Sequence, residues 1–204
     1  MAGAVAALVV AQGRGRRVGA AIAKTVASAG FVLLALLRAD ASSGYDRLVL
    51  LALGLCLLGD LLLLVPRAFA VGLASFLLAH LAYTAAFCAV ITPRAWSPFV
   101  AAVFALASGA AAVWLWPHLV RLQAAVVAYI AAITVMAWGA IATAGRTGWP
   151  AGVAGVLFYL SDLAVARDRF VVRRFASRAW GLPAYYLAQV LFALTLGRTG
   201  LGRP

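Results

Sequence analysis

Long apolar runs, separated by short segments that carry arginine, dominate the chain. Seven of these runs are close to the roughly 20 residues that an α-helix needs to cross a lipid bilayer. They are residues 18–37, 47–65, 69–90, 97–116, 120–142, 150–166 and 181–197. A shorter apolar stretch, 2–11, precedes them and could add only a truncated or tilted eighth span. The pattern predicts an all-α fold, a polytopic transmembrane helical bundle of seven or eight spans, as a single integral membrane domain over residues 1–204.

Lys24, Asp60 and Asp162 are charged residues that stand well inside these apolar runs. The chain has only five acidic residues, and an ionised carboxylate at the centre of a membrane helix costs about 2.5–3.5 kcal/mol. Such groups are usually directed into the interior of the helix bundle, where they mark functional sites. Asp60 and Asp162 are therefore candidate catalytic residues.

The depths of the polar residues agree with one another. At a rise of about 1.5 Å per residue, Lys24, Asp60 and Asp162 each lie roughly 7–10 Å from the arginine just outside their run on the same side of the bundle. These arginines are Arg17, Arg67 and Arg167. Three more polar residues lie about 12–20 Å from the same side of the bundle: Tyr129, Gln189 and His80. Six polar groups from six spans thus fall in one half of the membrane. This predicts a single polar cavity that opens toward the arginine-rich side.

Helical spacing indicates which side chains accompany these groups. His80 and Tyr83 share a helix face with Gly72 and Phe76, so we expect both to point into the cavity. Asp162 shares a face with residues that would supply an apolar and aromatic wall for a lipid-like chain: Gly155, Phe158 and Tyr159.

Each candidate also has a structural explanation. Asp60 paired with Lys24 would be a structural ion pair, and Asp162 beside Arg167 would reach the membrane interface. His80 would be a buried histidine with satisfied hydrogen bonds, and the tyrosines would be packing residues. The spacing of Asp60, Asp162 and His80 gives no compact metal-ligand pattern, and Lys24 would oppose a cation. We therefore expect no metal and no cofactor.

Composition excludes a soluble domain, because 66% of the residues are hydrophobic, 11% are charged and the mean hydropathy is +1.05. The net charge of +12 does not indicate a nucleic-acid partner, because the arginines fall in short loops between spans. The loop segment 167–178 is the most basic, and would attract anionic lipid headgroups at about 1 kcal/mol per basic residue.

Counting alternate loops assigns the arginines to two sides. One side holds ten: Arg14, Arg16, Arg17, Arg67, Arg121, Arg167, Arg169, Arg173, Arg174 and Arg178. The other side holds six: Arg38, Arg47, Arg94, Arg146, Arg198 and Arg203. The positive-inside rule favours the first side as cytoplasmic. We expect a multi-pass protein of a bacterial cytoplasmic (inner) membrane.

The chain resembles the YhhN-like lysoplasmalogenase family of integral membrane proteins, over nearly its whole length. The resemblance is carried by residues in a fixed order: Lys24, Gly59-Asp60, the pattern GLxxFxxxHxxY over 72–83, Tyr129, Gly155-x-x-Phe158-x-x-Ser161-Asp162, and Tyr186 with Gln189. The family often has proline after the lysine, whereas this chain has Thr25, and the first span is shortened here.

The resemblance implies hydrolysis of the vinyl ether bond of a lysoplasmalogen, a single-chain ether phospholipid. The products would be a fatty aldehyde and a glycerophospho-base, glycerophosphoethanolamine or glycerophosphocholine. Vinyl ether cleavage needs an acid and a water-activating base, a division that paired carboxylates supply in glycosidases. Our hypothesis assigns Asp60 and Asp162 as this pair, with Lys24 tuning one of them or holding the substrate phosphate. His80 and Tyr83 would position water or the ether oxygen.

Two other classes of function stay open at this point. Intramembrane Asp, Lys and His also mark proton-coupled transporters, although here they cluster in one half of the membrane. A non-catalytic lipid-binding protein would use a similar pocket for a single-chain lipid. The sequence does not decide the headgroup preference, the aspartate that donates the proton, or the oligomeric state.

Overall fold

A computed structural model describes residues 2–14, 16–119, 123–172 and 174–197, and the described chain is all-α, with no strand. Its α-helices are α1 (Ala2–Gly13), α2 (Arg17–Arg38), α3 (Gly44–Leu62), α4 (Phe69–Val90), α5 (Pro98–Leu115), α6 (Gln123–Thr147), α7 (Trp149–Ala166) and α8 (Phe175–Thr195). Short 3-10 turns η1 (Pro66–Ala68), η2 (Pro93–Ala95) and η3 (Trp116–His118) and a π-helical segment η4 (Arg167–Val171) lie in the connections. The predicted fold class is confirmed.

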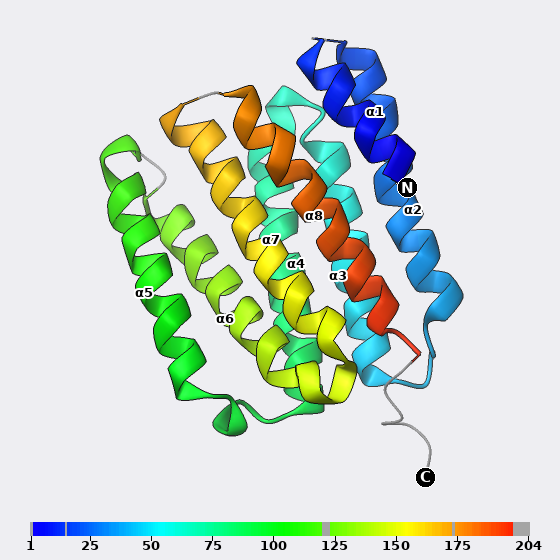
Figure 1. Ribbon diagram of the computed structural model, residues 1–204, viewed down its shortest axis with the longest axis vertical. Coiled ribbons are helices and arrows are strands. Elements are labelled where there is room, and N and C mark those ends of the chain that lie inside the picture. Colours follow the sequence, from blue (N-terminus) through cyan, green and yellow to red (C-terminus); the bar gives the residue numbers. More distant parts are fainter. Residues whose placement is uncertain (1, 15, 120–122, 173, 198–204) are drawn as a thin grey trace.

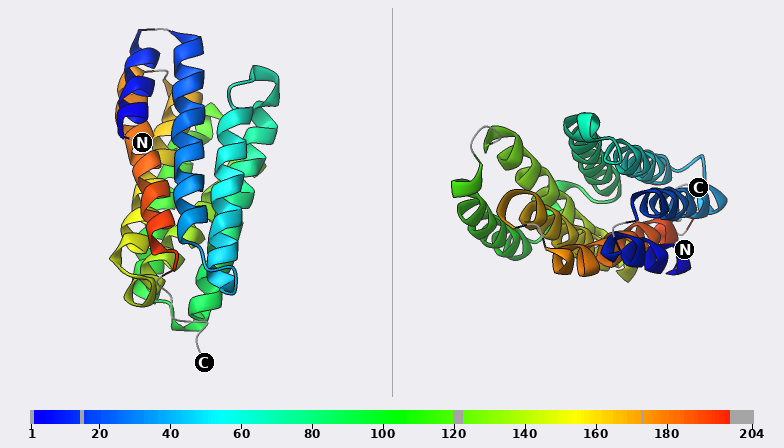
Figure 2. Two further views of the ribbon diagram at one scale, coloured as in Figure 1. Left: turned by 90° about the vertical axis from the view of Figure 1, so that its right-hand side faces the viewer. Right: turned by 90° about the horizontal axis from the view of Figure 1, so that it is seen from above.

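Helices α2 to α8 run alternately up and down as one bundle (Figure 1). The shorter helix α1 packs against α2 and α8. Seen along the helices, the bundle is curved, with α3 and α4 on one side and α5 and α6 on another (Figure 2). The connections α1–α2, α3–α4, α5–α6 and α7–α8 lie at the same end, the top of Figure 1. We call this the arginine-rich end.

Within the described residues, five helical segments are long and apolar enough to cross a membrane, judged by length and composition: Val18–Arg38, Pro66–Val90, Pro98–His118, Gln123–Thr147 and Trp149–Val171. Helix α1 has 12 residues, so it is about 18 Å long, well short of a hydrocarbon core of about 30 Å. The total of seven or eight spans stays a prediction.

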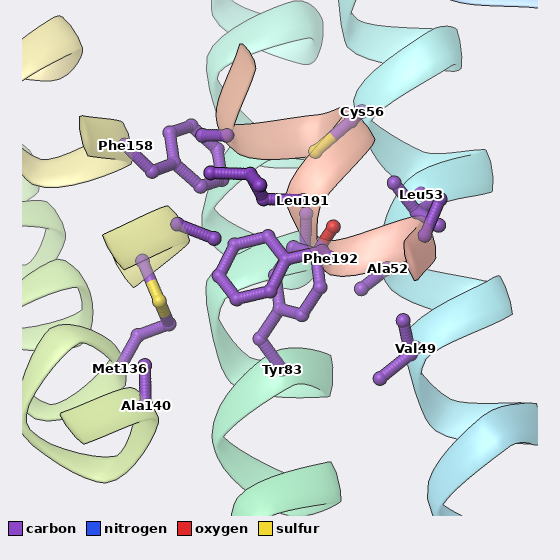
Figure 3. Packing of buried hydrophobic residues seen from close by; sticks show 14 of the residues in the cluster. Val49, Ala52, Leu53, Cys56, Tyr83, Met136, Ala140, Phe158, Leu191 and Phe192 are labelled. Carbon is purple, nitrogen blue, oxygen red and sulfur yellow. The ribbon is translucent and has the colours of Figure 1, made fainter. Parts of the chain in front are cut away.

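The outer surface is apolar, as a lipid-facing surface requires. Large hydrophobic side chains are exposed to 74–78% on α2 and α5: Val18, Leu37, Phe99, Leu106 and Val113. Most large buried side chains lie in one continuous core that joins the helices. Figure 3 shows part of this core, where the rings of Tyr83 and Phe192 stack at 4.2 Å between centroids.

Most element boundaries follow the apolar runs, and α4 matches 69–90 at both ends. One correction concerns α3, which ends at Leu62 where we expected 65. Val65 precedes Pro66 and is extended, with φ −102° and ψ 112°. The proline ring disfavours a helical conformation for the residue before it, so the helix ends earlier than hydrophobicity suggests. The expected start of 120–142 includes 120–122, which lie outside the described residues, and α6 continues to Thr147, five residues beyond the expected end.

A second correction concerns α8, which begins at Phe175 where we expected 181. Pro183 lies inside the helix, although a proline removes a backbone hydrogen bond there. The helix packs closely against α7 just before this proline: a Cβ atom added to Gly181 would lie 2.7 Å from the Cβ atom of Ala164. The close approach brings the α8 tyrosines beside the α7 residues of the candidate site.

Candidate active site

A cavity of about 560 Å³ runs from the arginine-rich end into the bundle. Its deeper walls are mostly apolar and come from several helices: Leu73, Phe76, Ile130, Ile133, Tyr159 and Leu182. Five polar residues that the sequence indicated also line it: Lys24, Asp60, Tyr129, Ser161 and Asp162. An apolar cavity of this size with a few convergent polar groups is typical of a small-molecule binding site. A cavity is present at the expected end of the bundle, and four of the six polar groups that we had grouped by depth line it.

Asp60, on α3, is surrounded by hydrogen-bond donors. Its Oδ1 atom lies 3.1 Å from the Lys24 ammonium nitrogen. Its Oδ2 atom accepts hydrogen bonds from the Ser28 hydroxyl at 2.6 Å and the Tyr185 hydroxyl at 2.8 Å. Because a carboxylate offers about four acceptor positions, these three donors leave one position free. The Lys24–Asp60 pair that we considered as a structural alternative is therefore formed, at the edge of the cavity.

Tyr186 contacts two of the residues that surround Asp60. Its hydroxyl lies 3.2 Å from the Ser28 Oγ atom and donates a hydrogen bond of 3.4 Å to the Lys24 carbonyl oxygen. Tyr186 is not among the residues that line the cavity, whereas its neighbour Tyr185 is. The structure thus places Tyr186 in contact with the residues around Asp60 and without a direct bond to the carboxylate.

Asp162, on α7, has few partners. Its Oδ2 atom lies 3.5 Å from the His80 Nε2 atom, which is long for a hydrogen bond. Within the described residues, neither His80 ring nitrogen nor Asp162 Oδ2 has a hydrogen-bond partner. The Asp162 side chain is 14% exposed, compared with 4% for that of Asp60. Asp162 is therefore the more accessible and less satisfied of the two carboxyl groups.

Aromatic rings enclose the His80 imidazole. The Phe158 ring lies 4.6 Å from it and the Tyr129 ring 5.1 Å, the latter edge-on. His80 is fully buried and does not line the cavity, so it lies behind Asp162. Our expectation that His80 and Tyr83 both point into the cavity is wrong. Phe76 shares their helix face and lines the cavity, but His80 and Tyr83 lie deeper along α4, where they are buried in the aromatic core. Phe158 is likewise buried in the core and not on the cavity wall.

Tyr83 and Gln189 form a separate polar pair. The Tyr83 hydroxyl donates a hydrogen bond of 2.8 Å to Gln189 Oε1, and both residues are completely buried. Neither residue lines the cavity. The pair therefore links α4 to α8 inside the core, apart from the two aspartates.

Sequence reasoning missed Ser28 and Tyr185, which bond directly to Asp60. Ser28 stands four residues after Lys24 and so shares its helix face, a signal that was available. Tyr185 stands beside Tyr186, and the choice between them depends on the rotation of α8. The described residues contain no group of three or more His, Cys, Asp or Glu side chains that could hold a metal ion.

Comparison with known proteins identifies relatives over most of the chain. The model of the YhhN family matches residues 19–196. Lysoplasmalogenase TMEM86B of Sus scrofa is 35% identical over 173 residues, which cover 84% of this chain and 74% of that protein. The human protein of the same name is 33% identical over 159 residues, 78% of this chain and 67% of that protein.

A bacterial relative is also similar. A protein named lysoplasmalogenase from Mycobacterium tuberculosis is 37% identical over 151 residues, which cover 69% of this chain and 56% of that protein. No solved structure matches the chain. Because the family model spans most of the described helices, including every residue of the two aspartate clusters, the chain belongs to the YhhN family.

Proposed function

We propose that this protein is a membrane-embedded ether hydrolase that cleaves the vinyl ether bond of a lysoplasmalogen. The products are a fatty aldehyde and a glycerophospho-base, glycerophosphoethanolamine or glycerophosphocholine. The enzyme class is supported by relatives named lysoplasmalogenase at 33–37% identity. The observation that carries the mechanism is that two aspartates with unequal surroundings line one largely apolar cavity.

The first step requires an acid. Protonation of the vinyl ether at the carbon next to the chain gives an oxocarbenium ion at the carbon that bears oxygen. We assign this proton to Asp162, because its carboxyl group has no cation beside it when His80 is neutral, and is the more exposed of the two. His80 and Tyr129 lie against Asp162 and act as positioning residues for it.

The second step requires a carboxylate that can orient water. Asp60 is held by Lys24, Ser28 and Tyr185, an arrangement that suits an ionised carboxylate. Its remaining acceptor position can take a proton from the water that attacks the oxocarbenium ion. As the resulting hemiacetal collapses, Asp60 gives its proton to the departing glycerol oxygen and Asp162 takes the proton of the hemiacetal hydroxyl, which releases the alcohol and the aldehyde. One water is consumed, and both aspartates end in their starting states.

The surroundings also suit the substrate. The apolar residues of the cavity provide a surface for a single hydrocarbon chain, and the polar groups gather at one place along it. We place the arginine-rich end in the cytoplasm, in agreement with the positive-inside rule, and the protein in a bacterial cytoplasmic membrane. The lipid substrate would then reach the cavity from the cytoplasmic leaflet.

The test is aldehyde release from an alkenyl lysophospholipid by the purified, detergent-solubilised protein. Asp60→Asn and Asp162→Asn should each lose most of the activity while remaining folded and monodisperse. Full activity in either variant would refute the paired-carboxylate mechanism. Lipid that binds tightly without aldehyde release, unaffected by either substitution, would favour a non-catalytic lipid-binding protein. Ion flux in proteoliposomes without chemical turnover would favour a transporter.

A further inference from the structure

The cavity mouth carries charges that the proposed hydrolysis does not use. We define the mouth by the lining residues nearest the arginine-rich end: Pro66, Asp168, Arg169, Phe170 and Arg178. They come from η1, from η4 and from the first turn of α8. η4 is a π-helical segment, a distortion that is frequent at functional sites.

Asp168 is fully engaged at this mouth. Its Oδ2 atom accepts a hydrogen bond of 3.0 Å from Arg178 Nε and lies 2.9 Å from Arg178 Nη2. Its Oδ1 atom accepts a hydrogen bond of 3.2 Å from the Arg174 backbone N–H. The Arg178 guanidinium is thereby fixed in position, while its side chain stays 40% exposed. Of its five N–H donors, those on Nη1 are not used by Asp168.

Arg169 is held in a different way. The central carbon of its guanidinium lies 4.0 Å from the centroid of the Phe69 ring, and Phe69 also lines the cavity. Stacking on an aromatic face orients a guanidinium and leaves its N–H edge free for an anion. Among the described residues, no acidic side chain forms an ion pair with Arg169.

The charges at the mouth therefore sum to one excess positive charge, from two arginines and one aspartate. Lys24, the other cation that lines the cavity, is paired with Asp60 and its side chain is only 12% exposed. An arginine-bearing site with one excess positive charge is complementary to a single phosphodiester. Lys24 is thus a poor candidate for the phosphate contact that the sequence had left open.

We propose that Arg169 and Arg178 bind the phosphodiester of the lysophospholipid substrate at the mouth of the cavity. The choice of ligand rests on the proposed function. A lysoplasmalogen carries its phosphate on one end carbon of glycerol and its vinyl ether on the other. Arg169 lies seven residues beyond Asp162, about 10 Å along the helix. A phosphate held at the mouth directs the ether oxygen and the hydrocarbon chain inward, toward the two aspartates.

The test measures binding of two ligands that cannot be hydrolysed at a vinyl ether. One is a saturated alkyl-ether lysophospholipid, and the other is the matching alkylglycerol, which lacks the phosphate. The protein is kept in a maltoside detergent and a phosphate-free buffer. Arg169→Gln should weaken binding of the lysophospholipid about tenfold and leave the alkylglycerol nearly unaffected, because only the first ligand has the anion. Arg169→Lys should recover part of the affinity, because it keeps the charge without the planar fork.

Arg67→Gln is the matched control, because Arg67 is exposed at the same end of the bundle and does not line the cavity. Equal losses for both ligands, no loss for either, or the same loss in Arg67→Gln would overturn the proposal. Inorganic phosphate at millimolar concentration should not displace the lysophospholipid. Displacement at concentrations comparable to that of the lipid would identify a site for a free anion instead.

This binding measurement is independent of turnover. Suppose that the wild-type protein releases no aldehyde from an alkenyl lysophospholipid, but that Arg169→Gln weakens binding of the lysophospholipid and not of the alkylglycerol. The proposed function then fails and the phosphate site stands. If aldehyde is released and Arg169→Gln does not weaken lysophospholipid binding selectively, the phosphate site fails and the hydrolase stands.

Discussion

Asp60 and Asp162 line the same cavity, but their surroundings are opposites. Asp60 meets one ammonium and two hydroxyl donors at 2.6–3.1 Å, and its side chain is 4% exposed. Asp162 meets the His80 imidazole at 3.5 Å and interacts with the Tyr129 hydroxyl, and its side chain is 14% exposed. We propose that these surroundings prepare two chemically identical side chains for different tasks. Enzymes that divide acid and base roles between two carboxyl groups use this principle.

The two aspartates should also differ in how much each contributes to the stability of the protein. Removing the Asp60 charge leaves the Lys24 ammonium without its partner, whereas removing that of Asp162 leaves no charged lysine or arginine unpaired among the described residues. We therefore predict that both aspartates are needed for turnover but only Asp60 is needed for stability.

The largest loss of turnover with the smallest structural change is expected for Asp162→Asn. An amide cannot donate the proton of a carboxylic acid, and general acid catalysis is worth about 10²–10⁴-fold in rate. The melting temperature should stay close to that of the wild type. Aldehyde release and thermal unfolding in the same detergent measure both quantities. Turnover within tenfold of the wild type would remove Asp162 from the mechanism.

Asp60→Asn should lose activity and stability together. Breaking a buried ion pair by removing one partner typically costs about 3–5 kcal/mol, because the other charge is left unpaired. The double variant Lys24→Met/Asp60→Leu is the matched control: it should recover stability, since no buried charge remains, and stay inactive. An Asp60→Asn protein as stable as the wild type would contradict the role of this pair.

A smaller effect is expected for Tyr185→Phe. This change removes one hydrogen bond to the Asp60 carboxylate, and a hydrogen bond to a charged group is worth about 1.5–3 kcal/mol. We expect roughly a tenfold decrease in kcat, which corresponds to about 1.4 kcal/mol in the barrier. Tyr186→Phe is the control on the adjacent residue, which contacts Ser28 and not the carboxylate. Equal effects of the two substitutions would show that direct contact with Asp60 does not matter.

The smallest effect on turnover is expected for Tyr83→Phe. Its hydroxyl bonds to Gln189 in the core, away from the cavity. Loss of this bond leaves the Gln189 carbonyl oxygen unpaired and should cost about 1–3 kcal/mol of stability. Measured at a temperature where the variant is folded, kcat should stay within about threefold of the wild type, well under 1 kcal/mol in the barrier. A loss as large as that of Asp162→Asn would bring Tyr83 back into the active site.

The helices and the end of the bundle at which the cavity opens could be predicted because they depend only on lengths and distances along the sequence. The length of each apolar run gives the helices, and the distance of Lys24, Asp60 and Asp162 from the loop arginines gives a common depth. Helix ends were less predictable, and proline acted in opposite ways: Pro66 follows the early end of α3, while Pro183 is accommodated inside α8.

The partners of each aspartate depend on how the helices are rotated about their axes, and the sequence does not give this rotation. His80 and Tyr83 share a face with Phe76, as expected, but only Phe76 reaches the cavity, while His80 and Tyr83 pack against Phe158 and Phe192 in the aromatic core. Rotation of α8 likewise brings Tyr185 to Asp60 and leaves Tyr186 behind it. The position of each residue along its helix was thus predictable, whereas its contacts with other helices and with the cavity were not.

The most direct test of the hydrolase mechanism is turnover of an alkenyl lysophospholipid by the purified protein in D₂O, with mass analysis of the trapped aldehyde. Protonation at carbon predicts one deuterium on the carbon next to the aldehyde group. The same product should be absent from reactions of Asp162→Asn. No aldehyde from the wild type, or aldehyde without deuterium at that carbon, would contradict the account.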